Sequence, residues 1–144
     1  MSALNILLVD GNRNLVTTLS DGLRKAMGKA ISVAVCFSGS EALSMLATQR
    51  FDVVISDYNM PDVSGLELMN KIRQDYRQTI LILTTSYGTD TLEEEVHRLG
   101  VGYITKPIGL SLLVQFIHDL IRDGTKNAPC ILIPDPKKDN ADMP

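Results

Sequence analysis

The stretch that decides the fold is Val53-Val54-Ile55-Ser56-Asp57-Tyr58-Asn59-Met60-Pro61-Asp62, in which a run of apolar β-formers ends in a carboxylate and a turn. Valine and isoleucine in a short run without interruption predict a strand that is buried on both faces. An acid at the carboxyl end of such a strand lies where open α/β sheets hold their ligands. Asp57 is therefore the first residue whose chemistry has to be explained.

Short apolar runs alternate with amphipathic stretches on both sides of this segment. The runs of strand length cover residues 6–9, 31–35, 53–55, 80–83 and 101–104. Helical patterns cover residues 12–27, 40–48, 65–74, 90–99 and 110–121, the last with an apolar face of period close to 3.6. This alternation predicts an α/β fold, a doubly wound five-stranded parallel sheet with five helices in three α/β/α layers.

The chain has the size and composition of one globular domain. It has 144 residues, of which 44% are hydrophobic and 22% are charged. The regular pattern covers residues 3–122, which we expect to form the domain. Residues 123–144 contain four of the six prolines and are expected to form a proline-rich tail or linker. Its apolar patch at residues 130–133 could dock on the domain, pack on a neighbour or be the start of a truncated segment.

Charge and cysteine content exclude several classes of protein. A net charge of -3 is no electrostatic footprint for nucleic acid or an anionic membrane, so direct binding to either is not expected. The start of the chain has no signal-peptide pattern, and no apolar run approaches the roughly 20 residues of a membrane span. Two cysteines make neither a disulfide framework nor a metal site. We expect a cytoplasmic protein.

Polar side chains follow four of the predicted strands at their carboxyl ends. They are Asp10, Asp57, Thr84 and Lys106. Because neighbouring parallel strands end at the same edge of a sheet, these side chains are expected to share one crevice. Two carboxylates repel each other and call for a cation, and their hard oxygen atoms suit Mg²⁺. The ammonium can pair with Asp57, so the set suits attack by a carboxylate on a phosphoryl group.

Several motifs in this order and spacing resemble the receiver domain of two-component response regulators. They lie at residues 6–10, 57–68, 83–85 and 102–107, and the likeness extends over residues 3–122. Around Asp57 the chain is most similar to the single-domain chemotaxis regulators. The resemblance implies a flavodoxin-like receiver fold and a role in signalling, with self-catalysed phosphorylation and dephosphorylation at Asp57 as its only catalytic activity.

The resemblance also implies roles for the residues of the crevice. Asp57 matches the aspartate that accepts a phosphoryl group from a sensor histidine kinase or a small phosphodonor. Asp10 matches the first residue of an acidic metal-binding pair, and the backbone carbonyl of Asn59 matches a further Mg²⁺ ligand. Thr84 matches the hydroxyl that moves to the phosphoryl group, and Lys106 matches its ammonium partner.

Three further positions match the part of the family that transmits the signal. Thr85 matches the small residue beside the switch hydroxyl, and Tyr103 matches an aromatic ring that turns inward. Pro107 follows Lys106 in a peptide bond that is usually cis in this family. The face of the fourth helix, fifth strand and fifth helix is then expected to contact a downstream protein or output domain, and the fourth and fifth helices could also pair two copies in a homodimer.

One position departs from the family pattern. Gly11 stands where the family has the second acid of the pair, so Mg²⁺ binding is expected to be weakened. Asp10 could take over the metal contact, or Asn12 could supply a neutral oxygen, although Asn12 also suits a helix cap. In the remaining alternative the domain is a degenerate receiver that acts as an interaction module without phosphorylation. A dehalogenase-type phosphatase is disfavoured, because it needs a second aspartate where Asn59 stands.

Overall fold

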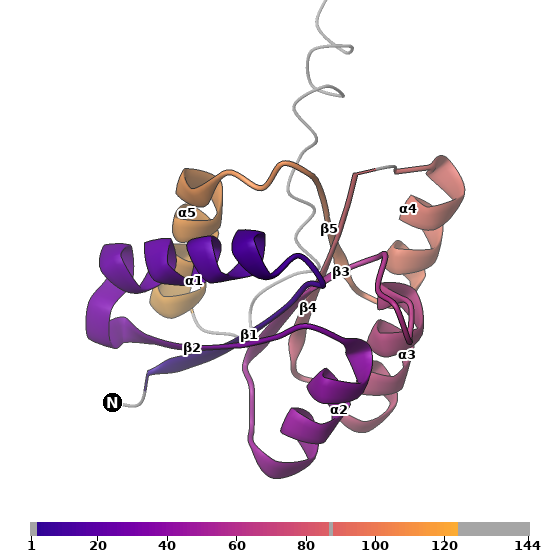
Figure 1. Ribbon diagram of the computed structural model, residues 1–144, viewed down its shortest axis with the longest axis horizontal. Helices are drawn as coiled ribbons and strands as arrows, with labels where there is room; N and C mark the ends of the chain where they lie inside the picture. Colours follow the sequence, from indigo (N-terminus) through magenta and orange to yellow (C-terminus); the bar gives the residue numbers. More distant parts are fainter. Residues whose placement is uncertain (1–2, 87, 124–144) are drawn as a thin grey trace, which may run out of the picture.

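One parallel sheet with strand order β2-β1-β3-β4-β5 forms the centre of the molecule (Figure 1). The computed structural model describes residues 3–86 and 88–123. Within them the strands are β1 (Leu4–Val9), β2 (Ile31–Cys36), β3 (Val53–Asp57), β4 (Ile80–Thr85) and β5 (Gly102–Thr105). The helices are α1 (Arg13–Met27), α2 (Gly39–Thr48), α3 (Gly65–Asp75), α4 (Asp90–Arg98) and α5 (Leu110–Asp123), with a short 3-10 turn at η1 (Gly28–Ala30).

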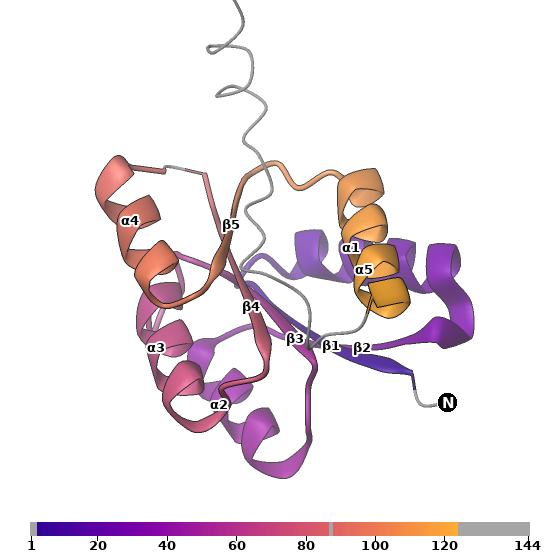
Figure 2. The same cartoon turned by 180° about the vertical axis from the view of Figure 1, so that it is seen from behind.

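Helices cover both faces of this sheet. Figures 1 and 2 show α1 and α5 on one face and α2, α3 and α4 on the other. Successive side chains of a strand point to opposite faces, so Ile6 and Leu8 join the core cluster under α1 and α5, whereas Leu7 and Val9 join the opposite one. The predicted three-layer α/β/α fold is confirmed. The predicted tail falls almost entirely on residues 124–144, which lie outside the described part of the chain.

Polar side chains cap the N-termini of four of the helices that follow strands. The side-chain oxygens of Asn12, Ser38, Ser64 and Thr89 each accept a hydrogen bond from the backbone N–H three residues later. Such a cap typically contributes about 1 kcal/mol. The cap predicted from sequence at Asn12 is confirmed, and the four caps together fix the loops at the carboxyl edge of the sheet.

Arg73 of α3 holds segments together at the opposite end of the strands from the carboxyl edge. Its guanidinium donates hydrogen bonds of 2.9–3.0 Å to the carbonyl oxygens of Arg77, Thr79, Leu99 and Gly100. These carbonyls belong to the segments before β4 and after α4. One charged side chain thus ties the start of β4 and the end of α4 to α3.

Ser20 of α1 is a buried polar side chain whose hydroxyl lacks a hydrogen bond among the described residues. The residue is 1% exposed. A buried hydroxyl without a partner costs about 1–3 kcal/mol, and alanine is also a better helix former. We expect Ser20→Ala to raise the free energy of unfolding by about 1 kcal/mol in urea denaturation.

The matched control is Ser44→Ala, because Ser44 lies on the exposed side of α2. That variant gains helix propensity alone, which amounts to about 0.5 kcal/mol. If Ser20→Ala proved less stable than the parent, the hydroxyl would have a partner in solution.

The described helices include none with the length and apolar character needed to cross a bilayer.

Candidate functional site

Two carboxylates lie side by side at the carboxyl edge of the sheet. Asp57 is the last residue of β3, and Asp10 directly follows β1. The parallel register pairs Val9 with Ser56, so the two acids that follow these residues are neighbours. Asp57 is 9% exposed and Asp10 is 7% exposed. The sequence-based expectation that these acids share one crevice is met in the structure.

Lys106 bridges the two acids from the end of β5. Its Nζ lies 2.8 Å from Asp10 Oδ2 and 3.3 Å from Asp57 Oδ1. The backbone N–H of Lys106 donates to the Thr85 carbonyl at 2.8 Å, and the peptide bond to Pro107 is cis. The closer partner is therefore Asp10, whereas the sequence predicted a pair with Asp57.

Burial and charge alter the ionisation of this trio. Burial raises the pKa of Asp57, the charge of Asp10 raises it further, and Lys106 offsets part of the increase. Burial disfavours the charge of Lys106, but the hydrogen bond that Lys106 donates to Asp10 and the charges of both acids raise its pKa above the ordinary value. The site thus holds more negative charge than its one lysine neutralises.

This raised pKa has a consequence for stability. The folded state holds the Asp57 proton up to a higher pH than the unfolded state does, so stability falls as pH rises through the folded pKa. We expect Asp57→Asn to be more stable than the parent at pH 7.5. The midpoint of thermal unfolding should rise by about 4 °C for each kcal/mol gained. The advantage should shrink as pH falls toward and below the ordinary aspartate pKa of 3.8, because the parent carboxyl then becomes protonated in the unfolded state as well as in the folded state.

Asp62 offers a control of opposite sign. Hydrogen bonds from the side chain and backbone of Ser40 hold the pKa of Asp62 below its usual range. Its charged form therefore stabilises the fold above the unfolded pKa, and that contribution is lost as pH falls through the folded pKa. Asp62→Asn should lower the midpoint at pH 7.5. An equal loss in Asp57→Asn would contradict the electrostatic account of the site.

Asp10 is held from a second side as well. Its Oδ1 accepts a hydrogen bond of 2.9 Å from the Asn12 N–H, while the Asn12 side chain accepts from the Leu15 N–H. Asn12 is thus a helix cap, as the sequence indicated. Gly11 between them has open space, because a Cβ there would meet only the Phe37 oxygen and Pro61 Cδ, both at 3.9 Å.

The oxygen donors near this edge fit a modest cation site. Asp10 and Asp57 supply two carboxylates of a kind that Mg²⁺ prefers, and the pKa of Asp57 is raised first by burial and then by the charge of Asp10. Among residues 3–86 and 88–123, no cluster of three or more acidic, histidine or cysteine side chains could hold a metal ion. Among the described side chains, the acidic donors at this edge are therefore these two carboxylates.

Thr84 and Thr85 end β4 beside Asp57. Thr84 pairs with Asp57 in the parallel register, and its Oγ1 donates a long hydrogen bond of 3.5 Å to the Ser56 carbonyl. Both threonines are 1% exposed or less. The Thr84 carbonyl accepts from the Tyr58 N–H at 2.8 Å, which fixes the start of the loop after Asp57. The Thr84 hydroxyl is close to the acids but bound to the strand.

Tyr103 lies inside the molecule on β5. It is 7% exposed and belongs to the core cluster on the α2–α4 face. Its hydroxyl approaches Gly88 so closely that a Cβ at position 88 would overlap it. A side chain at position 88 would therefore require the tyrosine ring to shift.

Comparison with known proteins decides the family of this site. The family model described as "Response regulator receiver domain" matches residues 6–118. The chain belongs to the response regulator receiver family. The receiver domain is 37% identical over 116 residues to "Response regulator protein FleR" of Pseudomonas aeruginosa, a match that covers 80% of this chain and 24% of that protein.

Solved structures agree with this assignment. The CheY-like receiver domain protein of Methanospirillum hungatei has a TM-score of 0.80 at 22% identity, and 88% of this chain covers all of it. Chemotaxis response regulator CheY4 of Vibrio cholerae has a TM-score of 0.73 at 27% identity, with 82% of this chain covering 98% of that one. The first likeness shows the fold, and the flavodoxin-like receiver architecture predicted from sequence is confirmed.

The receiver domain is shorter than its curated relatives. It spans between 19% and 53% of the length of five such proteins. Receiver domains of two-component response regulators are signalling domains, which interact with histidine kinases and output domains.

Sequence reasoning missed one residue of the receiver domain and could not indicate the partners of another. Gly88 has no sequence signal, because its contact with Tyr103 spans fifteen positions. Asp62 is at a position typical of a turn or cap residue, and it accepts hydrogen bonds from the Gly39 and Ser40 N–H groups and the Ser40 hydroxyl. It therefore caps α2 from a distant loop and ties the segment that carries Asn59 to that helix.

Proposed function

We propose that Asp57 accepts a phosphoryl group from a sensor histidine kinase or a small phosphodonor. The observation that supports this most strongly is the buried pair of acids bridged by the Lys106 ammonium, at 2.8 Å from Asp10 and 3.3 Å from Asp57. A carboxylate oxygen of Asp57 attacks phosphorus, the bond from phosphorus to the donor breaks, and the donor leaves with its electron pair. Self-catalysed gain and hydrolysis of this acyl phosphate is the only chemistry in the proposal.

Lys106 and Thr84 have separate tasks in this step. The ammonium is already near both acids. It can pair with a phosphoryl oxygen once Asp57 carries the phosphoryl group and has lost its own charge. The Thr84 hydroxyl has only a long hydrogen bond to the Ser56 carbonyl to give up before it donates to the same group. Little rearrangement is therefore needed to bind the product.

Mg²⁺ would be held by Asp10, Asp57 and the backbone carbonyl of Asn59. When bound, a divalent cation neutralises charge on the transferring phosphoryl oxygens. Gly11 removes one anionic ligand, so the affinity for Mg²⁺ is expected to be weaker than in a site with two consecutive acids. Asp10 would also have to share its carboxylate between the metal and Lys106.

The proposed output is a change in partner binding. Movement of Thr84 makes room beside Thr85, Tyr103 and Pro107, and the face of α4, β5 and α5 carries the change to a downstream protein or output domain. Residues 3–122 would act as this switch in the cytoplasm, with residues 123–144 as a tail or linker. A homodimer through α4 and α5 is a further prediction, which sedimentation with and without phosphodonor would test.

A second candidate function is a degenerate receiver that binds partners without phosphorylation. It is favoured by the contacts of Asp10, whose two oxygens are occupied by Lys106 and the Asn12 N–H. With glycine at position 11, the residue next to Asp10 supplies no further carboxylate for the metal. In this case the fold and the α4–β5–α5 face keep their role, and Asp57 is only a structural acid.

Intact mass spectrometry after incubation with acetyl phosphate and Mg²⁺ tests the proposal. The expected result is one added phosphoryl group, absent in Asp57→Asn and strongly reduced with EDTA. Asp52→Asn is the matched control, because Asp52 is a half-buried acid whose Oδ2 accepts from the Asn5 N–H, away from the site. A folded protein that gains no mass under any condition would favour the second candidate.

A further inference from the structure

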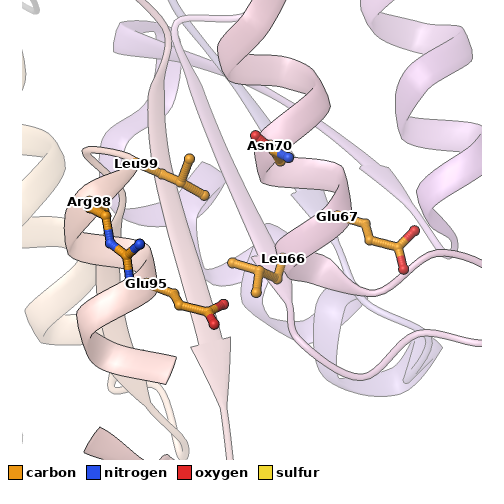
Figure 3. Close-up of a pocket in the computed structure, with 6 residues that line it drawn as sticks. All are labelled: Leu66, Glu67, Asn70, Glu95, Arg98 and Leu99. Carbon is orange, nitrogen blue, oxygen red and sulfur yellow. The ribbon is translucent and has the colours of Figure 1, made fainter. Parts of the chain in front are cut away.

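A groove between α3 and α4 lies outside the phosphorylation site. It encloses about 330 Å³ and is lined by Leu66, Glu67, Asn70, Glu95, Arg98 and Leu99. Figure 3 shows Leu66 and Leu99 pointing toward each other across the gap, with Glu95 and Arg98 on the α4 side. The groove thus has an apolar floor and a charged rim.

The rim has polar groups that nothing else engages. Within the described part of the chain, the side chains of Glu67, Asn70, Glu95 and Arg98 make no hydrogen bond or ion pair. Among the described residues, the two negative charges and one positive charge at the groove thus have no partner, and the Glu67 carboxylate points away from α4 (Figure 3). A ligand that matches the groove must offer aliphatic side chains, at least one acid and at least one base.

The chain itself contains a segment with this chemistry. Residues 130–138 read Cys-Ile-Leu-Ile-Pro-Asp-Pro-Lys-Lys, in which an aliphatic run is followed by one acid and two bases. We propose that this segment docks in the groove between α3 and α4. Its aliphatic side chains would contact Leu66 and Leu99, Asp135 would face Arg98, and Lys137 and Lys138 would face the two glutamates.

The connection to α5 is long enough for this. α5 and α4 lie on opposite faces of the sheet beside the edge strand β5 (Figures 1 and 2). Two packed layers separate the helix axes by roughly 20 Å. The path around the β5 edge is longer than this separation, and residues 124–132 reach about 30 Å when extended, at roughly 3.3 Å per residue. The aliphatic run can therefore reach the α4 side of the sheet around the β5 edge.

Tethering lowers the affinity that docking requires. A short flexible connection gives an effective concentration of the order of 1 mM, so a dissociation constant of about 1 mM already gives roughly half occupancy. Pro134 and Pro136 restrict the backbone of the segment, so less conformational entropy is lost on docking. A modest set of contacts in a partly exposed groove is therefore sufficient for the tethered segment to dock.

Paramagnetic NMR on the full chain tests the proposal. The Cys36 thiol is buried and its pKa is raised to about 12, so a spin label reacts selectively at Cys130. We expect the label to broaden the backbone amide signals of Leu66, Asn70 and Leu99, with recovery after its reduction by ascorbate. Signals of α1 on the opposite face should be unaffected. Unchanged groove signals would overturn the proposal.

A label at Cys130 is close to the contact itself, so a second position is needed. Cys130→Ser with Ala141→Cys carries the label beyond the lysines and should broaden the same signals. A mixture of labelled protein without isotope and unlabelled ¹⁵N protein separates docking within one chain from docking between copies. Broadening of equal strength in that mixture would make a second copy the occupant and overturn the proposal.

Charge reversal tests the pairing directly. Glu67→Lys with Glu95→Lys should abolish the broadening, as should Lys137→Glu with Lys138→Glu, and the two pairs combined should restore it. Glu94→Lys is the matched control, since Glu94 is exposed on α4 and does not line the groove. Failure of the combined variant to restore docking would contradict the pairing. The measurements need no phosphodonor, so their outcome is independent of the proposed phosphorylation.

Discussion

Gly65→Ala is expected to destabilise the protein by about 3 kcal/mol or more, which is among the largest effects of any single methyl group in this fold. A Cβ at Gly65 would lie 2.7 Å from Leu83 Cδ1 and 2.8 Å from Tyr58 Cα, and closer still to the Asp57 carbonyl oxygen. Real Cβ atoms do not approach other atoms this closely. Two of the three atoms are main chain and cannot rotate away.

The location of this contact adds a functional effect. The Gly65 N–H donates to the Tyr58 carbonyl at 2.8 Å, so the first turn of α3 packs against the residue that follows Asp57. Relief of the overlap must move either α3 or the strand end that carries the phosphoacceptor. Gly65→Ala should therefore slow phosphorylation even in the fraction of molecules that is folded.

Urea denaturation with Gly11→Ala as the control measures the effect on stability. The Cβ at Gly11 would have only ordinary contacts of 3.9 Å, so that variant should stay within about 0.5 kcal/mol of the parent. The two variants add the same methyl group near the same edge of the sheet and differ in the space available for it. A loss below 1 kcal/mol in Gly65→Ala would show that α3 is held less closely to β3 than the structure indicates.

The architecture followed from the sequence because local and global signals agree. Short runs of β-branched residues alternate with helical patterns, and side chains such as Asn12 and Ser64 begin helices by capping their first turn. The meeting of Asp10, Asp57 and Lys106 was also predictable. Parallel strands of similar length end at one edge, so residues that follow them must come together.

Non-local contacts were beyond what the sequence could show. The preference of Lys106 for Asp10 depends on a difference of about half an ångström between two distances, and the Asn12 N–H contributes by holding Asp10 in place. The Gly88 contact with Tyr103 and the cap that Asp62 provides to α2 join segments far apart in the chain. The periodicity of apolar residues predicts which face of a helix or strand is buried. It does not predict contacts such as these, which depend on how side chains of different helices, strands and loops lie relative to one another.

Gly11→Asp is expected to increase the affinity for Mg²⁺ by about ten-fold or more, because an added anionic ligand strengthens binding of a hard cation. The substitution is sterically open, since a Cβ at position 11 meets only two atoms at 3.9 Å. The backbone there is also suitable, because the glycines with positive φ among the described residues are Gly28 and Gly100. A new carboxylate at position 11 would join Asp10 and Asp57 at the same edge.

The effect on stability should change sign with the metal. In EDTA a third carboxylate adds repulsion to a pair that already raises the pKa of Asp57, so Gly11→Asp should unfold at a lower temperature than the parent. A ligand at 100 times its dissociation constant stabilises the folded state by about 2.7 kcal/mol. A titration of the unfolding midpoint with MgCl₂ measures both effects, with Gly11→Ala and Gly11→Asn as controls for size and for a neutral oxygen.

The same titration separates the two candidate functions because of where Lys106 lies. In the parent, a metal ion must compete with the ammonium 2.8 Å from Asp10, whereas a carboxylate at position 11 has no such partner. A strong Mg²⁺ response in Gly11→Asp and a weak one in the parent, with faster phosphorylation of the variant, would show a working site limited only by its missing ligand. Equal responses would mean that Asp10 releases Lys106 to bind the metal, and that Gly11 does not impair the site.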